Sequence, residues 1–70
     1  MKRLRLDGQK VLFIMAERLM SRTDLSEASD VSYRTITSAL GGKTVTTTTV
    51  GLIARALEVK PEEIATVVSV

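Results

Sequence analysis

The stretch SRTDLSEASDVSYRTITSALGG, residues 21–42, decides the fold because it predicts two short helices joined by a tight turn. Ser21 and Asp24 have the S-x-x-D spacing of a capping box, in which each side chain accepts a hydrogen bond from the other residue's backbone amide. A first helix is therefore expected over about 22–29. The pattern that follows predicts a second helix over about 33–40.

The residues between and after these helices fit the turn and the second helix end. Asp30 tolerates the left-handed backbone conformation of a turn better than most residues other than glycine. Ser32 is a good N-cap for the second helix, and Gly41 and Gly42 are residues that stop a helix. Two helices joined in this way have the helix-turn-helix layout.

Four residues of this segment are expected to hold the two helices together. Leu25 and Ile36 should form the contact between them, and Val31 should fill the turn. Ser26 is small at the position where the second helix must approach the first. With Ile36 turned inward, the residues around it from 33 to 38 would project outward.

The N-terminal side of this segment predicts an extended arm and a helix. Residues 2–6 alternate basic and apolar side chains, which suits a short strand or an extended arm. Asp7 can cap a helix over about 8–20, in which apolar residues recur at helical spacing. They are so frequent that this helix should be covered on more than one side.

The C-terminal side predicts two more helices and a final strand. We expect a loop to about residue 46, a helix over 47–57, and a short helix over about 61–66 that begins at Pro61. The valines of 67–70 suggest a strand that pairs with 2–6. The expected fold is thus an all-α bundle of five helices in one domain over residues 1–70, with a small terminal sheet.

The composition excludes most catalytic and metal chemistry. The 70 residues contain no Cys and no His, so the usual zinc ligands and the commonest general base are absent. Gly42-Lys43-Thr44 lacks the earlier glycine of a phosphate-binding loop, because Thr37 stands there. We therefore expect no enzyme activity, no cofactor and no metal.

The charge and the absence of targeting signals indicate where such a protein would act. Residues 1–43 carry eight basic and five acidic side chains, which suits a polyanionic partner, although a solvated surface explains the same charge. The apolar run 11–16 is too short to span a bilayer and has no cleavage pattern of a signal peptide. A cytoplasmic protein without membrane contact is expected.

Four segments together resemble the phage repressor and Cro-type helix-turn-helix proteins, the XRE family. DGQK at 7–10 resembles the family's entry to its first helix, and SRTDLS at 21–26 resembles its capped S-Q-x-x-L-A stretch. VSYRTIT at 31–37 resembles its V-S-x-x-T-I-S segment, and IARALEV at 53–59 resembles its I-A-x-A-L-G-V helix. The four segments occur in the family's order and spacing, over nearly the whole chain.

The departures from the family pattern are physically tolerable. Arg22 stands where the family has Gln, and Ser26 and Asp30 replace its usual Ala and Gly. The family often pairs an Arg of its first helix with a Glu near the end of its third. Met15 and Leu40 occupy those positions here, and exchanging both members of a buried ion pair for apolar residues is often neutral or stabilising.

The resemblance implies which residues would contact DNA. The family's base-reading positions correspond to Tyr33, Arg34, Thr37 and Ser38, on a helix that would lie in the major groove. Arg34 is the strongest candidate because a guanidinium can bond O6 and N7 of guanine together. The phosphate contacts would be Arg22, Thr23, Ser32, Lys43, Thr44, Thr46 and Thr47. Lys2, Arg3 and Arg5 would either follow the DNA backbone or protect a strand edge.

The resemblance also implies the biological role. It suggests sequence-specific binding of double-stranded DNA by a transcriptional regulator, a repressor that acts as a homodimer on two half-sites. A chain of this length buries only about 60% of its unfolded surface, so a partner chain would help its stability. The modest net charge of +2 keeps a second hypothesis open. In that hypothesis the fold serves as a protein-interaction module, an adaptor or antitoxin-like binder, that does not read DNA.

Overall fold

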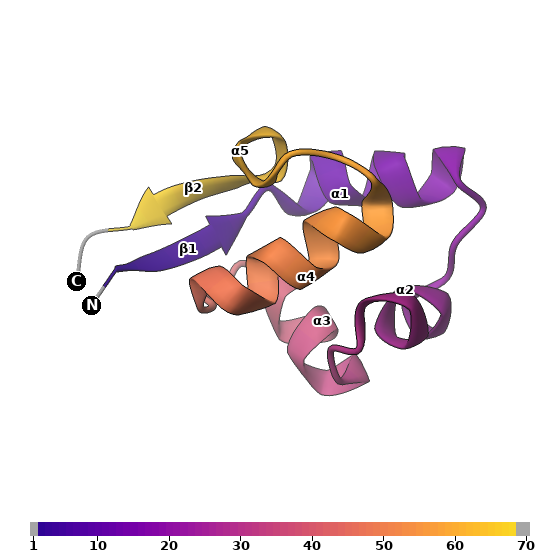
Figure 1. Cartoon of the computed structure of the whole chain (residues 1–70), viewed down its shortest axis with the longest axis horizontal. Coiled ribbons are helices and arrows are strands. Elements are labelled where there is room, and N and C mark those ends of the chain that lie inside the picture. The colour runs from indigo at the N-terminus through magenta and orange to yellow at the C-terminus, as the bar shows by residue number, and fades with distance from the viewer. Residues whose placement is uncertain (1, 69–70) are drawn as a thin grey trace.

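The computed structural model describes residues 2–68, and five helices account for most of them (Figure 1). The elements follow the order β1 (Arg3–Leu6), α1 (Gly8–Glu17), α2 (Arg22–Ser29), α3 (Tyr33–Leu40), α4 (Thr47–Leu57), α5 (Pro61–Ile64) and β2 (Ala65–Val68). The helical fold with a short terminal pairing of strands is therefore confirmed. In Figure 1, α1 runs along the upper side, α2 and α3 lie below it, and α4 crosses in front.

The caps predicted for α2 and α3 are all present. The backbone N–H of Ser21 donates to Oδ2 of Asp24 at 2.9 Å, and the N–H of Asp24 donates to the Ser21 hydroxyl at 3.1 Å. Asp30 ends α2 in the left-handed conformation, with φ of 61°. The Ser32 hydroxyl accepts from the N–H of Thr35 at the start of α3. These local bonds explain why the two helices have the bounds that the sequence predicts.

The contact between α2 and α3 is built as expected from buried apolar residues. Leu25 and Ile36 are almost fully buried, and Val31 is buried in the turn. Ser26 does more than leave room, because its hydroxyl donates to the carbonyl of Val31 at 2.6 Å. The Ser29 hydroxyl donates to the carbonyl of Leu25, also at 2.6 Å. The turn is thus fixed both by packing and by side-chain hydrogen bonds.

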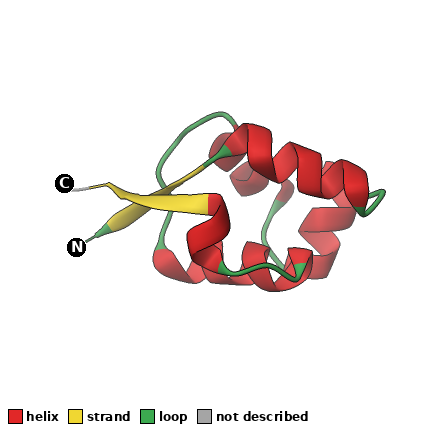
Figure 2. Ribbon diagram, turned by 90° about the horizontal axis from the view of Figure 1, so that it is seen from above, coloured by secondary structure: helices red, strands yellow, loops and turns green. Residues whose placement is uncertain are grey.

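The two strands pair antiparallel at the end of the molecule where both chain ends lie (Figure 2). The register sets Leu4 opposite Val67 and Leu6 opposite Ala65. On its other edge β1 also pairs with Val45, whose N–H and carbonyl exchange bonds of 2.7 and 2.9 Å with Leu4. The segment expected to be a plain loop to residue 46 therefore contains one residue that extends the sheet.

Helix α1 is shorter than predicted, because it ends at Glu17 and not near residue 20. The backbone reverses at Leu19, which has φ of 57°. The N–H of Leu19 bonds the carbonyl of Ala16, and the N–H of Met20 bonds the carbonyl of Met15. This is the hydrogen-bond pattern of a helix C-terminus that usually contains glycine. Because Leu19 stands where a glycine is usual, the sequence did not indicate that the helix ends here.

The last helix and the last strand also differ from the predicted bounds. Helix α5 ends at Ile64, where a helix to about 66 was predicted, and strand β2 begins at once with Ala65. Ala65 is extended because it pairs with Leu6. The strand was expected over 67–70, but residues 69 and 70 lie outside the part of the chain that the structure describes.

The remaining apolar residues form one core between the helices. Met15 and Leu40, which stand where the family often has an Arg–Glu pair, both belong to this core: Met15 is buried, and Leu40 packs against the buried residues.

Arg18 just after α1 forms an ion pair with Glu58 just after α4, with 3.1 Å between the Arg18 nitrogen and the Glu58 oxygen. No helix within residues 2–68 combines the length and the apolar character needed to cross a membrane.

Candidate nucleic-acid interface

Helix α3 has one buried and one exposed side, and the predicted base-reading residues occupy the exposed side. Ile36 and Ala39 are buried to 1% and 0% exposure, which fixes the helix against the core. Tyr33, Arg34 and Thr37 are exposed, and Ser38 is half-buried at the margin. A rigid helix with polar side chains at its N-terminal end is the arrangement that reads base edges in the major groove.

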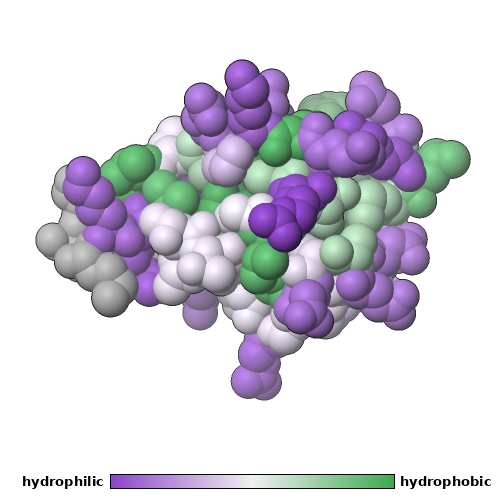
Figure 3. All heavy atoms as spheres, in the orientation of Figure 1, coloured by the Kyte–Doolittle hydropathy of each residue, from purple (hydrophilic) through white to green (hydrophobic). Residues whose placement is uncertain are grey.

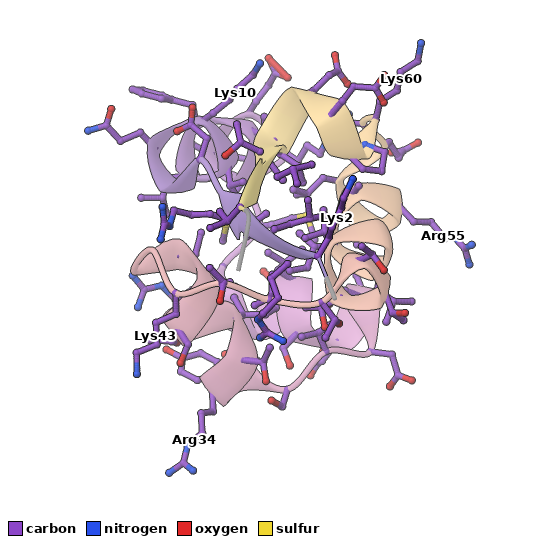
Figure 4. The ribbon with its side chains drawn as sticks, turned by 90° about the vertical axis from the view of Figure 1, so that its left-hand side faces the viewer. Lys2, Lys10, Arg34, Lys43, Arg55 and Lys60 are labelled. Atoms are coloured by element: carbon purple, nitrogen blue, oxygen red, sulfur yellow. The ribbon has the colours of Figure 1, made fainter. Side chains whose placement is uncertain are left out.

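Cationic side chains project from the α3 side of the molecule and also from the opposite side (Figure 4). Figure 4 shows Arg34 projecting from α3 on the lower side, with Lys43 also on the lower part of the view. Lys10 and Lys60 lie on the opposite, upper side. Neither Arg34 nor Lys43 belongs to an ion pair within residues 2–68. Both cations on the α3 side are thus available to an anionic partner.

The start of α2 supplies another part of this surface. Arg22 and Thr23 are exposed in the first turn, where backbone amides of a helix favour an anion. Asp24 in the same turn already places a carboxylate there. Two hydrogen bonds lower the pKa of Asp24. The larger effect comes from the backbone N–H of Ser21, and the smaller comes from the Ser21 hydroxyl. Asp24 therefore stays ionised at neutral pH, and a phosphate would have to bind beside it.

Two of the predicted phosphate contacts already have a structural role as helix caps. The hydroxyl of Ser32 bonds both the N–H and the hydroxyl of Thr35. The hydroxyl of Thr46 bonds the N–H and the hydroxyl of Thr49 at the start of α4. Thr47, by contrast, is exposed in the first turn of α4. A phosphate at either helix start would therefore meet the backbone amides more readily than the cap hydroxyls.

Two arginine side chains of β1 form hydrogen bonds with the loop between α3 and α4. The guanidinium of Arg3 donates to the hydroxyl and to the carbonyl of Thr44, both at 3.0 Å. Arg5 donates to the carbonyl of Gly42 at 3.0 Å. These bonds fix the backbone on either side of Lys43, whose side chain is exposed.

Arg3 and Arg5 have a role within the chain that the sequence did not suggest, because both bind one loop more than 35 positions further along the chain. The sequence contained one weak signal for this contact, the alternation of basic and apolar residues in 2–6. Its partner could not be identified from local spacing, since the contact is long-range. Contact of Lys2, Arg3 and Arg5 with the DNA backbone stays a prediction.

The structure places the predicted residues in three groups. Tyr33, Arg34, Thr37 and Ser38 lie together on α3, with Ser32 as its N-cap; Arg22 and Thr23 lie at the start of α2, and Lys43 to Thr47 form the segment before and at the start of α4. Within residues 2–68 no group of acidic side chains is arranged to hold a metal ion. The three groups offer hydroxyls, guanidinium groups, the ammonium of Lys43 and helix amides.

Comparison with known families agrees with this geometry. The sequence model of the Cro/C1-type HTH DNA-binding domain matches residues 10–69 of the chain. The match includes both helices of the helix-turn-helix, the loop that follows them, and α4. No curated protein and no solved structure gives a significant match.

Proposed function

Because the chain belongs to the Cro/C1-type HTH DNA-binding domains, we propose that it is a transcriptional repressor that binds double-stranded DNA sequence-specifically as a homodimer. The observation that supports this most is the division of α3. Its inner side is fixed by Ile36, while Tyr33, Arg34 and Thr37 remain exposed at its N-terminal end. The function is binding without catalysis, in the compartment that contains the DNA.

Each part of the surface has a defined role in this proposal. Arg34 reads a guanine through two hydrogen bonds, while Tyr33, Thr37 and Ser38 contact neighbouring bases. Arg22, Thr23 and Ser32 contact phosphates on one side of the groove. Lys43, Thr44, Thr46 and Thr47 contact phosphates on the other side. Phosphate contacts fix the orientation of α3 but carry no sequence information themselves.

Two measurements test this function. Binding to a random duplex should weaken steeply as the salt concentration rises, because bound phosphates release counterions. Selection of bound sequences from a random duplex pool should enrich a palindrome, with half-sites about one helical turn apart. Absence of salt-dependent duplex binding would reject DNA recognition and favour the protein-interaction module. Enrichment of an unpaired half-site alone would reject the homodimer.

A further inference from the structure

Large apolar side chains are exposed to solvent on one face of α1 and just after its end. Phe13 is 77% exposed and Leu12 is 45% exposed, and Leu19 just after the helix is 91% exposed. Figure 3 shows green, apolar spheres projecting at the end of the molecule where α1 ends. Phe13 borders two shallow hollows, one shared with Leu12 and Ala16 and the other with Lys10. Neighbouring exposed apolar side chains of this kind mark an interaction surface.

The charges beside this face are unfavourable within the single chain. Lys10 lies in the first turn of α1, next to the positive end of the helix dipole, and Glu17 is the last residue, at the negative end. Each charge would be more stable at the opposite end of the helix. Neither residue forms an ion pair within residues 2–68. An external partner that pairs both charges would remove this conflict.

A second copy of the same chain would meet this requirement by symmetry. Lys10 and Glu17 are seven residues apart, nearly two helical turns, so they lie on the same side of α1. If two α1 helices pack antiparallel about a twofold axis midway along this interval, Lys10 of each copy meets Glu17 of the other. Phe13 then lies near the axis, against the hollow between Phe13 and Ala16 of the second copy.

We propose that α1 is the homodimer interface, with Phe13 at its centre and two symmetric pairs between Lys10 and Glu17. This rests on the homodimer of the proposed function. Lys10 and Arg34 lie on opposite sides of the molecule (Figure 4). In a dimer whose twofold axis runs from the Lys10 side to the Arg34 side, the charge pairs of both copies lie on one side and both Arg34 side chains lie on the other. Two copies of α3 would then point toward the same duplex, and the proposal requires this direction of the axis.

The size of this face predicts a weak dimer. A helix of ten residues is about 15 Å long, so α1 alone covers less than the roughly 800 Å² per partner of a standard interface. Dimerisation should therefore be weak and reversible. The two copies would associate fully only when a duplex holds them together.

Sedimentation equilibrium of charge-swap variants tests the interface. Lys10→Glu and Glu17→Lys should each raise the dissociation constant about tenfold, because each creates like-charge contacts twice in the dimer. The double variant should restore it. Both swaps agree with the helix dipole, so neither threatens folding. A wild-type chain that is monomeric at about 1 mM, or a double variant as weak as the single ones, would overturn the proposal.

A matched pair of apolar substitutions distinguishes this face from the strand edge. Phe13→Ser should weaken the dimer, whereas Val67→Ser, at a residue 61% exposed on β2, should leave it unchanged. The opposite result would overturn the proposal and assign dimerisation to β2. Duplex binding is measured separately. Lys10→Glu should still bind a duplex with one half-site, so loss of dimerisation alone would leave DNA recognition intact.

Discussion

Two alanine substitutions at glycines should have opposite effects on stability, and the difference tests how α1 is seated. A Cβ at Gly8 would lie 2.6 Å from the backbone oxygen of Leu40, at the end of α3. Backbone cannot move aside as a flexible side chain can, so α1 and α3 must separate. Overpacking of this kind costs typically about 1–3 kcal/mol. We expect Gly8→Ala to lower the free energy of unfolding by that amount, although alanine favours a helix more than glycine does.

Gly51→Ala is the matched control. Gly51 lies inside α4, and a Cβ there would meet no heavy atom within 4 Å. The gain in helix propensity then acts alone and should raise the free energy of unfolding by about 0.5–1 kcal/mol. Both variants are compared by urea denaturation and thermal melting, where 1 kcal/mol shifts the midpoint by about 4–8 °C in a domain of this size. A Gly8→Ala variant as stable as the wild type would refute the close contact between α1 and α3.

The other predictions concern one cap, one carboxylate and one contact of the loop. Ser21→Ala should lower the free energy of unfolding at neutral pH by about 1 kcal/mol in urea denaturation, because α2 loses its N-cap. The lowered pKa of Asp24 means that its carboxylate stabilises the fold above its unfolded pKa and loses this effect as the pH falls through the folded pKa. The stability of the wild type should therefore fall below about pH 4, and Asp24→Asn should lack that part of the loss. Arg3→Lys keeps the charge but loses the two bonds to Thr44, so duplex binding should weaken roughly threefold to tenfold with an unchanged salt slope. Full binding by the lysine variant in a filter or anisotropy assay would show that only the charge matters.

The part of the fold that the sequence predicts best is the part fixed by local bonds. Ser21, Asp30 and Ser32 each determine a helix end through contacts within a few residues, and the structure has those ends. Helix α1 was predicted too long because apolar residues continue past its end. Leu19 adopts the left-handed conformation there without the glycine that would have indicated a stop.

Long-range contacts set the features that the sequence did not predict. Val45 pairs with Leu4, and the pairing of Ala65 with Leu6 ends α5 early. The hydrogen bonds from Arg3 to Thr44 likewise join residues that are 41 positions apart. No local spacing contains this information, because each of these contacts joins residues that are far apart in the sequence. For the candidate site, the sequence predicted which side of α3 is exposed, but not what supports the loop around Lys43.

The central claim, that the exposed side of α3 reads DNA, is tested most directly at Arg34. Fluorescence anisotropy with the selected duplex compares Arg34→Ala with Arg55→Ala. The second variant removes another exposed arginine, which projects from α4 on a different side of the molecule (Figure 4). We predict that Arg34→Ala loses about 1–3 kcal/mol of specific affinity, while its thermal midpoint stays unchanged. Arg55→Ala should bind as the wild type does. Equal affinities for the wild type and Arg34→Ala would contradict the assignment of α3 as the recognition helix.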